Sequence, residues 1–141
     1  VTAVLAPVNE SLWEHGKILL WPYLTAMLLL TRNGPPGCRT PWMLTALVMV
    51  AAMLGAGWVY HMTLGGEALM VDIGIYVVLM AAGFLLPELL SGASEHSFLG
   101  TLSALAVLAL SVALVLFTFL PPDHPLFLDL SGVNTWSTIP Y

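Results

Sequence analysis

The run LMVDIGIYVVLMAAGFLLPELL, residues 69–90, carries only two charged side chains, Asp72 near its start and Glu88 near its end. The other residues are apolar or small. An α-helix rises 1.5 Å per residue, so a run of this length can cross the hydrocarbon core of a bilayer, which is roughly 30 Å thick. We therefore expect a transmembrane helix over this run.

Three further apolar stretches accompany it. Residues 42–62 and 98–120 are also long enough to span a bilayer, whereas residues 16–30 are long enough only if their helix begins near Asn9. The sequence thus predicts an all-α fold, a polytopic transmembrane bundle formed by residues 1–120. Its four expected spans cover about residues 9–30, 41–62, 69–90 and 98–120.

Composition supports a lipid environment for the whole chain. Of the 141 residues, 59% are hydrophobic and only 8% are charged, whereas a soluble domain carries about a quarter charged residues. The net charge of −5 leaves no basic patch for a nucleic acid. Cys38 is the only cysteine, which excludes an internal disulfide and a multi-cysteine metal site.

Glycine and proline mark the breaks between the stretches. Turn-forming residues occupy 33–37, 65–66 and 91–94, and a Pro-Pro pair at 121–122 closes the last stretch. The tail, residues 121–141, contains Phe127, Trp136 and Tyr141. Aromatic residues of this kind settle at the headgroup level, so we expect the tail to lie along the membrane interface.

Two arginines, Arg32 and Arg39, lie in the first loop. The positive-inside rule places that loop on the cytoplasmic side. We expect a multi-pass protein of the cell membrane, of the bacterial cytoplasmic type. The opposite, outer face then gathers most of the acidic residues together with His15, His61 and His124.

A polar cluster, NESLWEHGK, occupies residues 9–17 at the start of the first span. Asn9 is suited to cap the helix and Glu10 to interact with its dipole, which explains both residues without any activity. On an ideal helix Glu10, Glu14 and Lys17 share one stripe, whereas His15 points the opposite way. We expect Glu14 or Glu10 to pair with Lys17, and His15 to meet another helix.

His61 and Asp72 are predicted to lie at the same membrane depth as the cluster, on either side of the turn at residues 65–66. Together with Glu14 they make a set of imidazoles and carboxylates of the kind that binds zinc or relays protons. The candidate catalytic residues are Glu14, His15 and Asp72. The candidate metal ligands are Glu10, Glu14, His15, His61 and Asp72. In the alternative, structural interpretation His61 and Asp72 pair with each other or with the backbone.

The signature Asn-Glu-Ser-x-Trp-Glu-His-x-Lys at residues 9–17, followed by Trp21-Pro22, resembles that of a family of small uncharacterised prokaryotic integral membrane proteins. The resemblance extends to Asp72-Ile73 and to the proline-rich run that begins at Pro121. It implies a further helix before the signature, of which Val1–Val8 is expected to be the remnant. It implies no particular reaction, cofactor or substrate.

Two functional hypotheses follow from the sequence. The first is an accessory or structural subunit that docks on other membrane-protein helices, for which the small-residue pairs Ala51/Gly55 and Ala52/Ala56 are suited. The second is a membrane-embedded cation or proton site at the outer face, one form of which is a metal-dependent lipid hydrolase with Glu14 or Asp72 as its base. The sequence favours the non-enzymatic hypothesis and identifies no cofactor.

Overall fold

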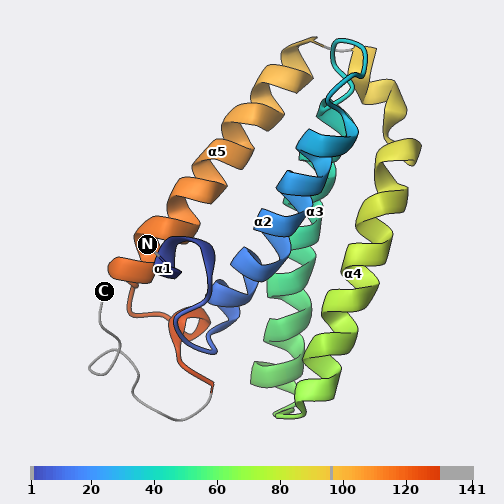
Figure 1. Ribbon diagram of the computed structural model, residues 1–141. Coiled ribbons are helices and arrows are strands. Elements are labelled where there is room, and N and C mark those ends of the chain that lie inside the picture. Colours follow the sequence, from blue (N-terminus) through green and yellow to red (C-terminus); the bar gives the residue numbers. More distant parts are fainter. Residues whose placement is uncertain (1, 96, 131–141) are drawn as a thin grey trace.

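The computed structural model describes residues 2–95 and 97–130 (Figure 1). Trp136 and Tyr141 of the predicted interfacial tail lie outside the described residues. Within the described ranges the secondary structure is helical, as predicted. The elements are α1 (Thr2–Leu5), α2 (Leu12–Leu30), α3 (Thr40–Gly57), η1 (Trp58–Thr63), α4 (Leu69–Leu89), η2 (Ser91–Glu95), α5 (Ser97–Phe119) and η3 (Pro125–Phe127).

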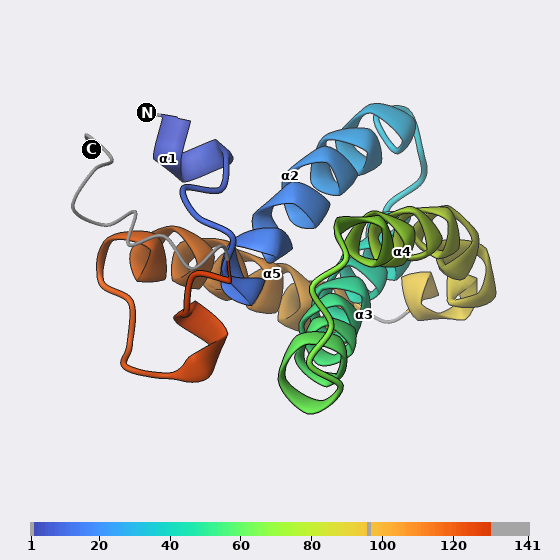
Figure 2. The same cartoon turned by 90° about the horizontal axis from the view of Figure 1, so that it is seen from below.

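The four long helices run up and down, so that their connections alternate between two ends of a bundle (Figure 1). The upper end in Figure 1 carries residues 31–39 and 90–95. The lower end carries residues 58–68, the segment before α2 and the segment after α5. The view from below shows α3 lying among the other three long helices, all of which it contacts (Figure 2).

The core forms where α2, α3 and α5 meet. Leu19 and Tyr23 of α2 pack with Met49 and Val50 of α3 and with Leu114 of α5, and all five side chains are almost completely buried. Where helices lie in a bilayer, lipid tails are as apolar as these side chains, and close van der Waals packing rather than transfer from water drives their association. These contacts therefore hold α2 and α5 on either side of α3.

A glycine sets the distance between α4 and the rest of the bundle. Gly83 is one of only two buried residues of α4, and a Cβ at this position would collide with the side chain of Met49. The missing side chain also lets the Tyr23 hydroxyl donate to the Gly83 carbonyl oxygen at 2.8 Å. Close approach at a small residue is typical of helix pairs in membranes.

Three of the described helices, rather than the four expected, are long and apolar enough to cross a membrane. They cover Thr40–Thr63, Leu69–Leu89 and Ser97–Phe119, close to the predicted ranges. The first predicted span falls short because α2 carries Glu14, His15 and Lys17 within its first two turns. This helix also begins at Leu12, later than the expected start near Asn9.

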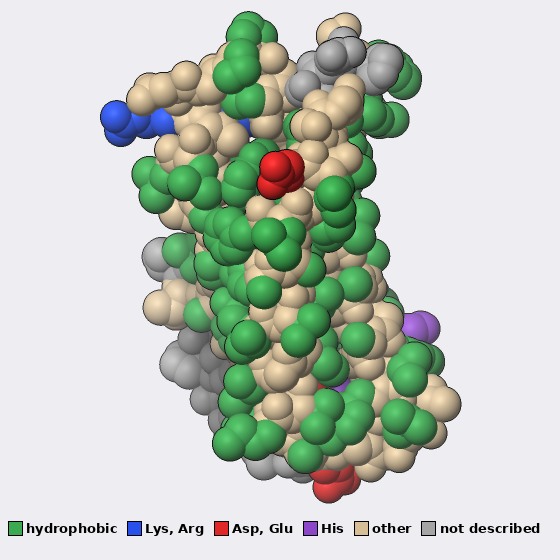
Figure 3. Space-filling model, turned by 90° about the vertical axis from the view of Figure 1, so that its right-hand side faces the viewer, with side chains coloured by type: hydrophobic (Ala, Val, Ile, Leu, Met, Phe, Trp, Pro, Cys, Tyr) green, Lys and Arg blue, Asp and Glu red, His purple; other side chains and the backbone are tan. Residues whose placement is uncertain are grey.

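The outer surface of the bundle is strongly apolar. In Figure 3 hydrophobic side chains cover much of the face over α4, and the acidic side chains visible there lie toward its two ends. Large residues such as Val77, Val78 and Leu85 are exposed along α4. Because a surface of this kind is poorly solvated by water, it is compatible with a surrounding bilayer.

Candidate functional site

The polar cluster begins with a helix cap. Ser11, with an extended backbone, accepts a hydrogen bond on its hydroxyl oxygen from the Glu14 amide at 3.3 Å. The predicted cap, Asn9, instead turns the preceding loop, because its Oδ1 accepts from the Ser11 amide at 3.1 Å. Ser11 and Glu14 have the spacing of a capping box, but the Glu14 carboxylate turns away to the backbone amide of Val8 at 3.2 Å.

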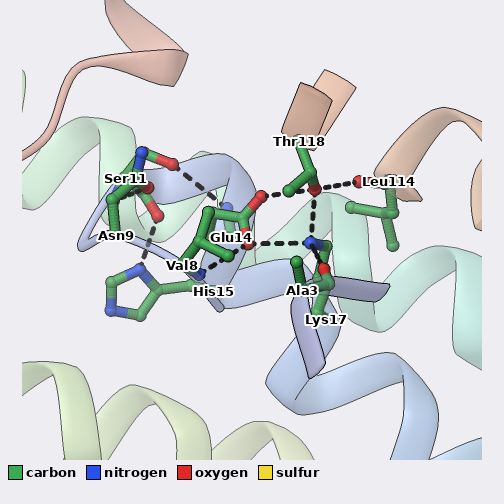
Figure 4. Close-up of polar contacts among 9 residues, drawn as sticks. All are labelled: Ala3, Val8, Asn9, Ser11, Glu14, His15, Lys17, Leu114 and Thr118. Carbon is green, nitrogen blue, oxygen red and sulfur yellow. Dashed lines mark hydrogen bonds and ion pairs between the residues drawn. The ribbon is translucent and has the colours of Figure 1, made fainter. Parts of the chain in front are cut away.

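Glu14 and Lys17 form a buried ion pair, as predicted (Figure 4). Lys17 Nζ lies 2.9 Å from Glu14 Oε2, and the side chains are 0% and 2% exposed. Two further acceptors surround the ammonium group: the carbonyl oxygen of Ala3 at 2.8 Å and the hydroxyl of Thr118 on α5. The Thr118 hydroxyl in turn contacts Glu14 Oε1 at 2.8 Å.

This network is closed. The three N–H bonds of Lys17 have three acceptors, and each carboxylate oxygen of Glu14 has at least one donor. A buried charge pair is tolerated when such additional hydrogen bonds satisfy both partners. The network ties the segment before α2, helix α2 and the end of α5 together, and it engages all three N–H bonds of Lys17 and both carboxylate oxygens of Glu14 within the protein.

His15 faces away from this network, as predicted. Its Nδ1 lies 2.8 Å from the carbonyl oxygen of Ser11, so that nitrogen carries a proton and donates it (Figure 4). In the neutral ring, Nε2 is then an acceptor. Figure 4 shows this second nitrogen pointing away from Glu14 and Lys17.

His61 and Asp72 contact each other directly, as the structural interpretation predicted. His61 lies in the π-helical turn η1, and its Nε2 is 2.8 Å from Asp72 Oδ1 in the first turn of α4. The other ring nitrogen, Nδ1, lies 2.8 Å from the carbonyl oxygen of Gly66. The pair is only partly covered, with side-chain exposures of 7% and 16%.

The loop between η1 and α4 is held in place around this pair. Gly65 has a φ of +66°, a conformation that favours glycine, and it turns the chain back toward η1. The Gly66 amide then donates to the Tyr60 carbonyl at 2.9 Å, and the Ala68 amide donates to the Tyr60 hydroxyl at 3.0 Å. The carbonyl oxygen of Gly66 is thereby presented to His61.

A pocket of about 710 Å³ lies at the lower end of the bundle, between the start of α2 and the connection from η1 to α4. Four of the five predicted metal-ligand candidates line it, and a third carboxylate, Glu67, lines it as well. No lysine or arginine does. The lining residues are Pro7, Asn9, Glu10, His15, Ile18, His61, Gly65, Gly66, Glu67, Leu69, Asp72 and Leu130.

The structure therefore brings Glu10, His15, His61 and Asp72 around one cavity and separates Glu14 from them. Among the residues of the described ranges, no three His, Cys, Asp or Glu side chains come close enough to hold a metal ion. The wall of the cavity instead carries more hydrogen-bond acceptors than donors, because three carboxylates and the Nε2 atom of His15 line it.

Sequence reasoning missed two residues. Thr118 completes the buried network, and the sequence gives no signal that separates it from the other hydroxyl residues of α5. Glu67 was seen only as one of several charges on one membrane side, although its place directly after Gly65-Gly66 puts it on the pocket wall.

Comparison with known families gives one result. Residues 1–134 match a family model, DUF6512, which is described as a family of unknown function. The chain belongs to this family. Among curated proteins and solved structures, no significant match is found. The family supplies no activity, so the function has to be argued from the site itself.

Proposed function

We propose that the protein is an integral membrane protein that binds an organic cation of the alkylammonium class in the pocket at the lower end of the bundle. The observation that carries the proposal is the composition of the pocket wall: Glu10, Glu67 and Asp72 line it without any lysine or arginine. Glu10 and Glu67 are exposed and Asp72 is half-buried, and nearby carboxylates favour a positive charge in the pocket.

The volume argues for an organic cation rather than a bare ion. A pocket of about 710 Å³ falls in the ordinary range for small-molecule sites, roughly 300–1,000 Å³. Ile18, Leu69 and Leu130 give the wall an apolar part. A ligand with a protonated amine and a short hydrocarbon chain matches both the carboxylates and this apolar part.

The proposal includes a fourth membrane span. Charged side chains oppose insertion of α2 into lipid, but Glu14 and Lys17 are buried against protein and neutralise each other. The remaining part of α2 is apolar up to Leu30. We propose that α2 crosses the bilayer together with α3, α4 and α5, in a cytoplasmic membrane of bacterial type, with the pocket on the outer side.

The test is a binding measurement on the protein in lipid nanodiscs, with empty nanodiscs as the reference for partitioning into lipid. We expect n-hexylammonium to bind by calorimetry, and hexanoate and hexanol not to bind. Glu10→Gln and Glu67→Gln should each weaken binding several-fold. Glu88→Gln is the matched control, because Glu88 is an exposed carboxylate in the last turn of α4, at the opposite end. Equal affinity for ammonium, carboxylate and alcohol would refute the proposal.

A second candidate function is that of an accessory subunit, and one observation on α3 favours it. Ala51 and Gly55 are exposed on this helix, and a Cβ at Gly55 would meet no atom within 4 Å. Such small residues let another helix approach closely. If a partner helix docks there, Gly55→Leu should reduce the size of the native assembly extracted in mild detergent, whereas Gly74→Leu, at an exposed glycine of α4, should not.

The hydrolase hypothesis retains only part of its residue set. Glu14 has both carboxylate oxygens engaged by Lys17, Thr118 and the backbone of Val8. Asp72 and His15 line the pocket, but Oδ1 of Asp72 is engaged by His61 Nε2 at 2.8 Å. Our proposal for the pocket is ligand binding alone, and it includes no catalytic step.

A further inference from the structure

We infer that the pocket exchanges a proton for its organic cation: binding of one ammonium group releases one proton held between His61 and Asp72. The inference rests on the proposed function and adds its coupling to pH. It follows from counting hydrogen-bond donors and acceptors around the His61 ring.

Both nitrogens of His61 face acceptors. The Gly66 carbonyl, 2.8 Å from Nδ1, can only accept, and the Asp72 carboxylate, 2.8 Å from Nε2, accepts as well. A neutral imidazole carries one N–H and can satisfy only one of these partners. The observed geometry therefore contains one additional proton, as an imidazolium opposite a carboxylate or as a neutral imidazole opposite a carboxylic acid.

Loss of that proton without replacement is unfavourable. With the Nδ1–H bond to Gly66 kept, the Nε2 lone pair would lie opposite the Asp72 carboxylate at 2.8 Å. With the other tautomer, the Nδ1 lone pair would lie opposite the Gly66 carbonyl oxygen. Either arrangement places two acceptors together, and the loop that carries Gly66 is fixed by Tyr60. The Gly66 carbonyl oxygen is therefore held opposite Nδ1 of His61.

An ammonium group at this position removes the conflict. One of its N–H bonds can donate to His61 Nε2 and another to the Asp72 carboxylate, while Nδ1–H continues to donate to Gly66. In the exchange the bond between the shared hydrogen and Nε2 or Oδ1 breaks, the proton passes to water, and the ammonium brings in one positive charge. The net charge of the site is unchanged, which limits the electrostatic cost of the step.

The other titratable groups around the pair keep the cation at this position. Glu10 precedes α2, His15 lies on α2 and Glu67 lies in the loop before α4, and all three line the same pocket. The Tyr60 ring packs edge-on against His61 with centroids 4.9 Å apart. The carboxylates of Glu10 and Glu67 attract the incoming cation. The proton and the cation compete for the position between His61 and Asp72.

The direction of the pH effect follows from this exchange. At low pH the pair holds its proton and competes with the ligand; as pH rises, the competition falls. Where the pair is fully protonated, the affinity for n-hexylammonium should increase about tenfold per pH unit, the slope that release of one proton requires. Where the pair has lost its proton, the affinity should become independent of pH.

The experiment is calorimetry of n-hexylammonium binding to the protein in nanodiscs, repeated in buffers with different ionisation enthalpies, which counts released protons. In the pH range where affinity rises about tenfold per unit, we expect close to one proton per ligand for the wild type and for Glu10→Gln, which binds more weakly but keeps the pair. His61→Gln leaves the Asp72 carboxylate without a proton to hold, so we expect binding with no proton release. Circular dichroism checks that each variant retains its helices.

The outcomes separate the two proposals. Binding by the wild type without proton release at any pH, or equal release by His61→Gln, would overturn the exchange while leaving the ammonium site standing. No binding of n-hexylammonium at any pH would overturn both. A release of one proton that disappears only in His61→Gln would support the exchange specifically.

Discussion

Lys17 Nζ lies 2.9 Å from Glu14 Oε2 in a part of the bundle where both side chains are almost fully buried. The pair joins the start of α2 to the end of α5 through Thr118. Its role is structural, and it neutralises the two charges that would otherwise oppose placing α2 in a membrane. The His61–Asp72 pair differs because it borders a cavity.

Removing one partner of the buried pair should be costly. Lys17→Met leaves the Glu14 carboxylate buried without its counter-ion, and breaking such pairs costs about 3–5 kcal/mol. We expect this loss in the free energy of unfolding measured in mixed detergent micelles. The double variant Lys17→Met with Glu14→Gln removes both charges and should recover a large part of it. Equal stability of the wild type and Lys17→Met would contradict the closed network.

Thr118 should matter through its hydroxyl rather than its shape. Thr118→Val keeps the volume but leaves Glu14 Oε1 without its donor and Lys17 without one acceptor. An unsatisfied buried polar group costs about 1–3 kcal/mol. Thr118→Ser should stay close to wild type. Thr101 is the control, since its exposed hydroxyl donates to the Ser97 carbonyl of its own helix, and Thr101→Val should change stability little.

Gly83 should resist enlargement because α4 approaches Met49 and Tyr23 there. A side chain would displace Met49, and overpacking of this kind costs about 1–3 kcal/mol. We expect Gly83→Leu to lower the thermal midpoint in detergent. Gly74→Leu, also on α4, meets no atom within 4 Å at its Cβ and should be tolerated. Similar losses in the two variants would argue against close packing at Gly83.

Topology can be read by thiol labelling. Cys38 lies in the connection from α2 to α3 at the upper end, and Glu67 lies in the connection from η1 to α4 at the lower end. If α3 crosses the bilayer, a membrane-impermeant maleimide should label Cys38 and a Glu67→Cys, Cys38→Ser variant from opposite sides of sealed vesicles. The positive-inside rule predicts that Cys38 is the cytoplasmic one. Labelling of both from one side would refute the span.

Much of the fold could be predicted because apolar length is a local property of the sequence. The expected ranges agree closely with α4, with α5, and with α3 and η1 taken together. The start of the first helix was predicted wrongly, because Asn9 was expected to cap it and Ser11, whose hydroxyl is equally suited to capping, does so instead. The structure selects Ser11, since Asn9 is used in the preceding turn.

Part of the site could also be predicted. Helical periodicity indicated that Glu14 or Glu10 pairs with Lys17 and that His15 faces away. In the structure Glu14 is the partner of Lys17, and His15 does face away. The predicted gathering of imidazoles and carboxylates at one end of the bundle is found for His15, His61 and Asp72. Glu14 does not join them, because Thr118 on α5 and the backbone of Val8 bind its carboxylate on the other side of α2.

The sequence by itself determined the helical class, the three strongly apolar helices and the few polar residues that could form a site, because hydropathy, periodicity and turn residues act over short distances along the chain. Only the tertiary structure decided which of these polar residues meet. Lys17 and Thr118 are far apart in sequence, and so are His15 and Asp72. Helix packing encloses Lys17 and Thr118 in one buried hydrogen-bonded network. The same packing places His15 and Asp72 on the wall of one cavity.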